Sequence, residues 1–114
     1  MITLWHNPRC SKSRAALKLL EDRGVEVTVR RYLDDAPDRA EIDAVLHKLG
    51  LPASALLRDG ERLYTDLRLG EVDNEDDLLD AMAENPILIE RPIAIRGKRA
   101  VIGRPPENVL GLLD

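Results

Sequence analysis

The first 32 residues restrict the fold most, because two short apolar runs flank a helical stretch. Ile2–Trp5 is apolar and β-prone, which predicts a buried strand. Ser11–Arg23 carries apolar residues at helical spacing, and Gly24 is predicted to end this helix. Val25–Tyr32 alternates valines with polar residues and predicts a second strand. A strand, a helix and a strand in this order predict a parallel pair with a right-handed crossover.

The middle of the chain predicts further helices. Asp38 and Glu41 have the spacing of a capping box, and apolar residues at helical spacing follow them up to a glycine. Asp73 or Asn74 is expected to cap another helix, which stops before the next proline. Pro52–Leu57 is a candidate for a short helix, and the residues after it carry no clear pattern.

The last part of the chain predicts a β-hairpin and a final helix. Ile93–Ile95 and Ala100–Ile102 are short β-prone runs around Gly97, and Pro105 and Pro106 start the helix. The hairpin adds antiparallel strands to the parallel pair. The whole pattern predicts an α/β, thioredoxin-like fold: a mixed four-stranded sheet flanked by helices, with a helical insertion between the β-α-β unit and the C-terminal hairpin. The length favours a single domain over residues 1–114.

Composition excludes several classes of function. The net charge of −4 gives no general reason to bind nucleic acid. No apolar run approaches the roughly 20 residues of a membrane span, and the N-terminus does not resemble a secretory signal. A single cysteine can form neither an internal disulfide nor a four-cysteine zinc site, so we expect no metal and a reducing compartment. We therefore expect a soluble, cytoplasmic protein with no nucleic-acid or membrane partner.

The lone Cys10 lies between a predicted strand and a predicted helix. Free backbone N–H groups and the helix dipole at that end stabilise a thiolate. A lone cysteine is commonly a small buried hydrophobic residue. The polar neighbours argue against that reading here and give the loop the composition of an anion site: Arg9, Ser11, Lys12, Ser13 and Arg14.

Other polar residues are weaker candidates. Arg91 precedes the first hairpin strand and Arg104 follows the second, and flanking prolines and a glycine restrict the backbone at both. Arginine forks suit tetrahedral oxyanions, although a lone arginine is usually solvated surface charge. Arg58 lies in a segment that could be any loop. His6 either tunes the thiol or the loop, or only bonds the loop backbone, and His47 is expected to be a surface or packing residue.

Several motifs match a known family. His6–Arg14 resembles the active-site loop of the glutaredoxin-coupled arsenate reductases (ArsC family). The resemblance continues through Ala55–Arg58, Asn85–Ile93 and Ile102–Glu107, and so covers essentially the whole chain in order.

The resemblance implies a thioredoxin-like fold with a helical insertion and a covalent mechanism. Cys10 would be the nucleophile, and Arg58, Arg91 and Arg104 would hold the oxyanion, with a cis bond before Pro92. Arsenate or a similar oxyanion would be the substrate, glutathione the co-substrate and glutaredoxin the partner, with no bound cofactor. Without an internal resolving cysteine, an external thiol must complete the cycle. The supporting residues are expected to be His6, Asn7, Ser11, Ser13, Arg14 and Pro92.

The resemblance leaves alternatives open. The loop reads Cys10-Ser11-Lys12-Ser13 where plasmid-type enzymes have Cys-Gly-Thr-Ser, and the chain lacks their C-terminal extension, so it resembles a shorter, arsenate-reductase-like branch. A glutathione-dependent thiol transferase or deglutathionylase is one alternative. Another is a transcriptional regulator like the Spx proteins, which bind RNA polymerase and usually sense oxidation with a Cys-x-x-Cys pair. Ser13 replaces the second cysteine here, so that internal switch cannot form.

Overall fold

The computed structural model describes residues 1–113, which fall into two units. The sheet unit comprises Met1–Asp35 and the chain from Arg91 onward. The helical unit is Ala36–Glu90. The β-α-β segment and the C-terminal hairpin thus belong to one unit, and the predicted insertion forms the other. The single domain predicted over residues 1–114 stays a prediction.

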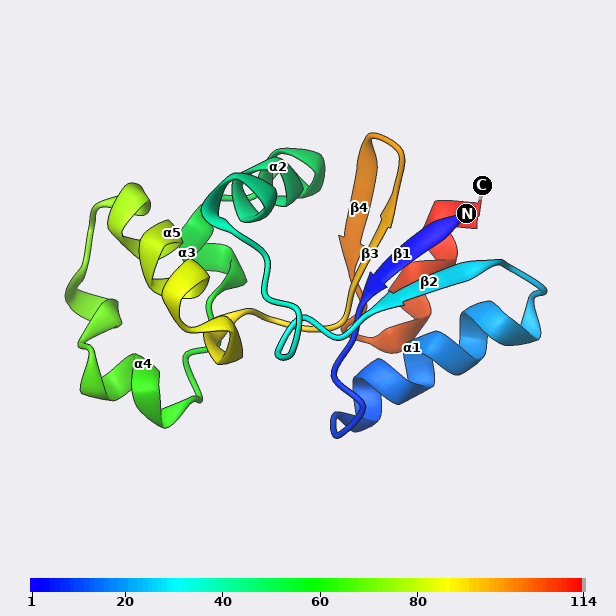
Figure 1. The fold of residues 1–114 in the computed structure, drawn as a ribbon, viewed down its shortest axis with the longest axis horizontal. Helices are drawn as coiled ribbons and strands as arrows, with labels where there is room; N and C mark the ends of the chain where they lie inside the picture. The colour runs from blue at the N-terminus through cyan, green and yellow to red at the C-terminus, as the bar shows by residue number, and fades with distance from the viewer. Residues whose placement is uncertain (114) are drawn as a thin grey trace. The chain divides into compact units, whose positions relative to one another are not determined.

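A mixed four-stranded sheet organises the sheet unit (Figure 1). Its strands are β1 (Ile2–Trp5), β2 (Val27–Arg30), β3 (Ile93–Arg96) and β4 (Arg99–Ile102). The order across the sheet is β2-β1-β3-β4. β1 pairs with β2 in parallel, and β3 pairs antiparallel with both β1 and β4. The predicted parallel pair, hairpin and fold class are therefore confirmed.

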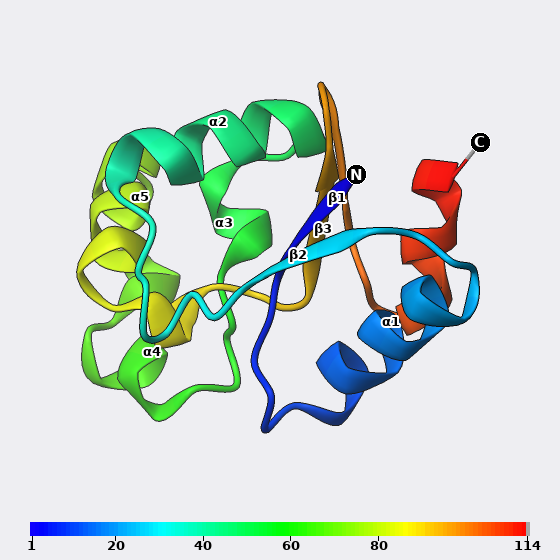
Figure 2. The same ribbon diagram turned by 45° about the vertical axis from the view of Figure 1, so that its right-hand side comes forward.

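Two helices pack on the sheet and build the core of this unit. They are α1 (Ser11–Asp22) and the 3-10 helix η3 (Pro106–Leu113), which lie side by side (Figures 1 and 2). Gly24 follows α1 with φ +69° and its N–H donates to the Glu21 carbonyl, as a C′ glycine does. The fully buried core is aliphatic and comprises Ile2, Leu4, Ala16, Leu20, Ala94, Val109 and Leu112.

The second strand is shorter than the predicted Val25–Tyr32, because backbone groups at both of its ends are used elsewhere. The N–H of Val25 donates to the Leu20 carbonyl and so belongs to the end of α1. At the other end, the Arg31 carbonyl accepts from the N–H groups of Asp34 and Asp35 in a turn. Between these bonds, Val27–Arg30 form β2 against β1, and the Glu26 carbonyl accepts from the Ile2 N–H.

The helical unit contains four α-helices and two short 3-10 helices among the described residues. α2 packs against α5 and α3, and α5 also contacts η2. An antiparallel bridge joins Leu57 to Ile89 inside this unit. The elements are α2 (Arg39–Leu49), α3 (Ala53–Leu56), α4 (Arg62–Asp66), η1 (Leu69–Glu71), α5 (Glu75–Glu84) and η2 (Pro86–Leu88).

Helix caps in this unit follow the sequence closely. The carboxylate of Asp38 accepts from the Glu41 N–H at 2.8 Å, and the Glu41 side chain accepts from the Asp38 N–H at 3.2 Å, so the capping box is confirmed. Asn74, not Asp73, caps α5 by accepting from the N–H of Asp76 at 2.9 Å. The sequence did not predict α4, η1 and η2, because elements of three to five residues show no helical period.

Candidate functional site

Cys10 is the N-cap residue of α1, as the sequence predicted. Its backbone N–H donates to the Asn7 carbonyl at 3.0 Å, which closes the loop in front of the helix. The Asn7 side chain accepts from the Arg9 N–H at 3.0 Å, and Arg14 donates to the Pro8 carbonyl at 2.9 Å. The thiol is partly exposed. The loop is therefore held by its own contacts, and its sulfur remains accessible.

The surroundings of Cys10 favour the thiolate. Partial burial raises the pKa of the thiol, but the hydrogen bonds that reach the sulfur outweigh this effect. The donors, in order of effect, are the backbone N–H of Ser13, the guanidinium of Arg91 and the backbone N–H of Lys12. The charge of Arg91 adds further attraction. The pKa of Cys10 therefore lies below its ordinary value, as expected at a helix N-terminus beside an arginine.

Two buried side chains fix the loop behind the cysteine. His6 is 5% exposed and Ser13 is fully buried. The Ser13 hydroxyl lies 2.7 Å from Nδ1 of His6 and accepts from the Asn7 N–H at 3.0 Å. Ser13 thus ties the end of β1 to the first turn of α1, while its own N–H faces the thiolate.

The surroundings of His6 disfavour its protonated form. Burial lowers its pKa, and the charges of Arg31 and Arg14 lower it further, while Glu21 opposes them weakly. A neutral ring whose Nδ1 carries no proton can accept a hydrogen bond from the Ser13 hydroxyl there. The contact therefore ties His6 to the first turn of α1, and its tuning of the thiol stays a prediction.

Arg91 precedes β3 and Arg104 follows β4, so both lie at the open end of the hairpin and contact each other. Nη1 of Arg104 donates to the Arg91 carbonyl at 3.1 Å, and both side chains are partly buried. The Arg91–Pro92 bond is cis, as the resemblance implied, and the Arg104–Pro105 bond is cis as well. The sequence singled out both arginines, and the sheet unit brings Arg91 to Cys10.

Gly103, the glycine that precedes Arg104, packs against the residues around Pro92. Its N–H donates to the Pro92 carbonyl at 2.8 Å. A Cβ at this position would lie 2.7 Å from Pro92 Cγ and 3.0 Å from Val109 Cγ1. Only glycine lets the end of β4 pack this closely on the residue after Arg91.

Arg58 belongs to the helical unit, and its predicted oxyanion role stays a prediction. Its backbone N–H donates to the Leu88 carbonyl at 2.8 Å. Its guanidinium faces two carboxylates, with Nε 3.3 Å from Glu61 and Nη1 3.9 Å from Glu90. No sequence signal pointed to these glutamates, because pairing across a loop leaves no periodic pattern.

The remaining candidates differ in their surroundings. Ser11 is the first residue of α1 and is exposed. His47 is also exposed, as expected; its Nδ1 lies 2.8 Å from the Asp43 carbonyl. Residues 1–113 contain no group of three His, Cys, Asp or Glu side chains arranged to hold a metal ion. Within the same residues, no helix has the length and apolar character needed to span a bilayer.

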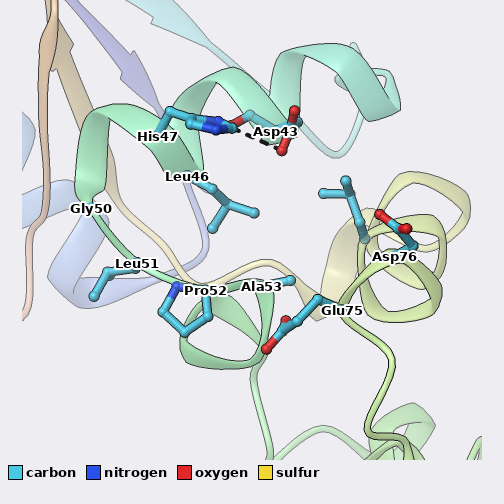
Figure 3. Close-up of a pocket in the computed structure, with 10 residues that line it drawn as sticks. Asp43, Leu46, His47, Gly50, Leu51, Pro52, Ala53, Glu75 and Asp76 are labelled. Atoms are coloured by element: carbon cyan, nitrogen blue, oxygen red, sulfur yellow. Dashed lines mark hydrogen bonds and ion pairs between the residues drawn. The ribbon is translucent and has the colours of Figure 1, made fainter.

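A cavity of about 330 Å³ lies wholly within the helical unit (Figure 3). Leu46, Leu51 and Leu79 supply apolar walls, and Asp43 and Glu75 supply acidic groups. None of the predicted site residues lines it. The predicted reactive residues therefore lie at the N-terminus of α1. There the Cys10 sulfur is a nucleophile beside helix N–H groups and Arg91.

Known proteins resemble this chain over almost its full length. A model of the ArsC family matches residues 5–112. An arsenate reductase of Neisseria meningitidis serogroup A is 46% identical over 114 residues, covering 98% of this chain and 97% of that protein. A protein of Escherichia coli K12 named uncharacterized protein YfgD is 45% identical over 114 residues, covering 98% and 96%. The solved structure of an arsenate reductase from Vibrio cholerae has a TM-score of 0.94 at 45% identity, covering 96% and 95%.

Proposed function

The chain belongs to the ArsC family, and from that premise we propose that it reduces arsenate to arsenite through a covalent intermediate on Cys10. Glutathione and glutaredoxin serve as the external thiols. The observation that carries the proposal is the Cys10 thiol, whose pKa is lowered by helix N–H groups and by Arg91. A thiolate with neighbouring donors suits attack on a tetrahedral oxyanion.

The first step is attack of the Cys10 thiolate on arsenic. A sulfur–arsenic bond forms, and one arsenate oxygen leaves as hydroxide or water after it takes a proton. Arg91 and Arg104 balance the charge of the oxyanion, and Arg58 is proposed as a further oxyanion-binding arginine. The N–H groups of Lys12 and Ser13, which stabilise the thiolate in the free protein, are released to the oxyanion as sulfur becomes covalently bound.

The second step reduces arsenic with an external thiol. The glutathione thiolate attacks the Cys10 sulfur, and a disulfide forms between Cys10 and glutathione. The electron pair of the sulfur–arsenic bond stays on arsenic, which leaves as arsenite. Glutaredoxin then attacks the glutathione sulfur and releases the Cys10 thiolate. Cys10 is the only cysteine of the chain, so no internal thiol can do this work.

These co-substrates imply a compartment in which thiols are kept reduced. Glutathione and glutaredoxin maintain such a state in the cytosol. Our proposal therefore places the protein in the cytoplasm, with no resident cofactor and with arsenate, glutathione and glutaredoxin as its partners.

The test is arsenite production from arsenate with glutathione, glutaredoxin and a glutaredoxin-reducing system. The parent protein is expected to turn over, and Cys10→Ser is expected to be inactive. Turnover that survives in Cys10→Ser would overturn the covalent mechanism. If the parent forms the glutathione disulfide on Cys10 but produces no arsenite, the thiol transferase alternative replaces the arsenate assignment.

A further inference from the structure

Arg58 lies between two carboxylates that its unit holds in place. Nε of Arg58 is 3.3 Å from Oε1 of Glu61, and Nη1 is 3.9 Å from Oε1 of Glu90. We propose that Glu61 and Glu90 are counter-ions that an oxyanion must displace from Arg58, and that they thereby set the oxyanion affinity of this arginine. The inference deepens the proposed function and rests on its assignment of Arg58 to the oxyanion.

The backbone builds this arrangement on both sides of Arg58. The Glu61 N–H donates to the Arg58 carbonyl at 3.3 Å, which closes the turn that returns Glu61 to the arginine. On the other side, the Arg58 N–H donates to the Leu88 carbonyl and the Glu90 N–H donates to the Leu56 carbonyl, both at 2.8 Å. These two bonds flank an antiparallel bridge and bring Glu90 beside Arg58. Both carboxylates are therefore placed by main-chain bonds.

The guanidinium is only partly satisfied by these contacts. The 3.9 Å between Nη1 and the Glu90 carboxylate allows an ion pair but is too long for a hydrogen bond. Nη1 is buried and donates no hydrogen bond within residues 1–113. A buried donor without an acceptor is costly, and charge-assisted bonds to an oxyanion are short and strong. An oxyanion that binds Arg58 would therefore accept the hydrogen bond from Nη1 that Glu90 is too far away to accept.

Glu61, the nearer carboxylate, competes more directly with an oxyanion for Arg58. Nε and Nη1 belong to different edges of the guanidinium, so each two-pronged approach of an oxyanion meets one of the glutamates. The side chains of Arg58, Glu61 and Glu90 are 21%, 24% and 23% exposed, so solvent screens the competition only in part. Neutralising Glu61 removes the nearer competitor and keeps the shape of its side chain.

The expected effect is tighter oxyanion binding in Glu61→Gln. A partly exposed pair of this kind corresponds to about a 2- to 5-fold change in affinity. The KM for arsenate is expected to fall by about that factor, with kcat unchanged, because Glu61 contacts no reacting atom in the proposed mechanism. Glu90→Gln is expected to act in the same direction with a smaller effect, since its oxygen lies farther away.

The experiment measures arsenate binding by isothermal titration calorimetry in the Cys10→Ser background, where no reaction follows. Glu61→Gln is compared with Glu71→Gln, an exposed glutamate of the same unit and the same change in charge. Tighter binding in Glu61→Gln, but not in Glu71→Gln, supports the proposal. Equal or weaker binding overturns it, as does undetectable arsenate binding in both proteins.

Arg58→Ala separates this inference from general charge effects and from the proposed function. In an Arg58→Ala background, Glu61→Gln is expected to give no gain, because the arginine that it frees is missing. A gain that persists there overturns the counter-ion role. Arsenite production by the parent tests the function itself. Turnover with unchanged arsenate affinity in Glu61→Gln refutes this inference alone, whereas tighter binding without turnover refutes the function alone.

Discussion

The two units of the chain carry opposite charge. Residues 1–35 and 91–114 contain 12 basic and 7 acidic residues, a net +5, whereas residues 36–90 contain 5 basic and 14 acidic residues, a net −9. The overall charge of −4 conceals this difference. An anionic substrate is therefore attracted by the sheet unit, where Cys10 lies, and repelled by the net charge of the helical unit.

Arginines are used differently in the two units. In the sheet unit several donate to main-chain carbonyls, such as Arg14 to Pro8 and Arg104 to Arg91, although Arg30 also pairs with the Asp35 carboxylate. In the helical unit they face carboxylates: Arg39 pairs with Asp76 and Asp80, and Arg62 with Asp66, in addition to the two partners of Arg58. A carbonyl fixes an arginine without cancelling its charge. The first arrangement keeps positive charge available to an anion, and the second neutralises it.

Helix N-termini show the same contrast. Asp38 caps α2 and Asn74 caps α5, so the side chains of these residues occupy the first backbone N–H groups. At α1 the corresponding position holds Cys10, and the N–H groups of Lys12 and Ser13 face its sulfur. At α1 the helix N–H groups therefore stabilise a thiolate in place of an ordinary side-chain cap.

Arg91→Ala should have the largest effect, because it removes a positive charge beside Cys10 in the sheet unit. Loss of a charge-assisted bond of about 1.5–3 kcal/mol predicts roughly a 10- to 100-fold fall in arsenate turnover. It should also raise the pKa of Cys10, because Arg91 lowers it. The pH dependence of iodoacetamide alkylation measures the second effect. Arg62→Ala is the matched control from the helical unit, and a Cys10 profile that is the same in both variants contradicts the prediction.

Gly103→Ala should have the next largest effect. Its new Cβ meets Pro92 and Val109, and overpacking of this kind costs about 1–3 kcal/mol of unfolding free energy. Urea denaturation measures the loss. Gly111→Ala serves as control, since a Cβ at Gly111 meets nothing within 4 Å. Equal stability of the two variants would contradict the prediction, since Pro92 and Val109 would then move aside at no measurable cost in free energy.

Asn74→Ala tests an ordinary cap in the helical unit. Removing the side chain that accepts from the Asp76 N–H should lower stability by about 1 kcal/mol. Thermal or urea denaturation measures this change. Asp73→Ala should cost less, because Asp73 is not the cap. The alkylation profile of Cys10 should stay unchanged, and a shift in it would argue against separate roles for the two units.

Acid should destabilise the sheet unit through His6, by the smallest of these effects. Its folded-state pKa is lowered, so the unfolded chain binds a proton that the folded one resists. The contribution of His6 to stability is therefore complete above its ordinary pKa of about 6.5 and declines as the pH falls through that value toward the lower one of the folded state. Urea denaturation between pH 7 and pH 5 should show a smaller decline in His6→Gln. His47→Gln controls for the loss of a histidine, and equal slopes in the parent and His6→Gln would contradict the prediction.

Local patterns were sufficient wherever neighbours in sequence make the structure. The capping box at Asp38, the C′ glycine at Gly24 and the hairpin turn at Gly97 depend on contacts within a few residues. The ends of β2 could not be predicted, because the end of α1 and the turn after Arg31 compete for its backbone groups. The short helices after Leu57 were missed because they are held by turns and carry no apolar period.

The candidate site divides in the same way. The sequence alone determined that Cys10 starts a helix among cations, because strand, loop and helix are consecutive there and the helix N-terminus itself stabilises a thiolate. Only the tertiary structure decided that Arg91 reaches the sulfur, that Gly103 packs on Pro92 and that Glu61 and Glu90 flank Arg58. Most of these contacts join residues distant in the chain. In all of them, a change of a few tenths of an ångström in the distance between atoms alters the interaction. Residue type and spacing do not encode such distances; packing and main-chain hydrogen bonds set them.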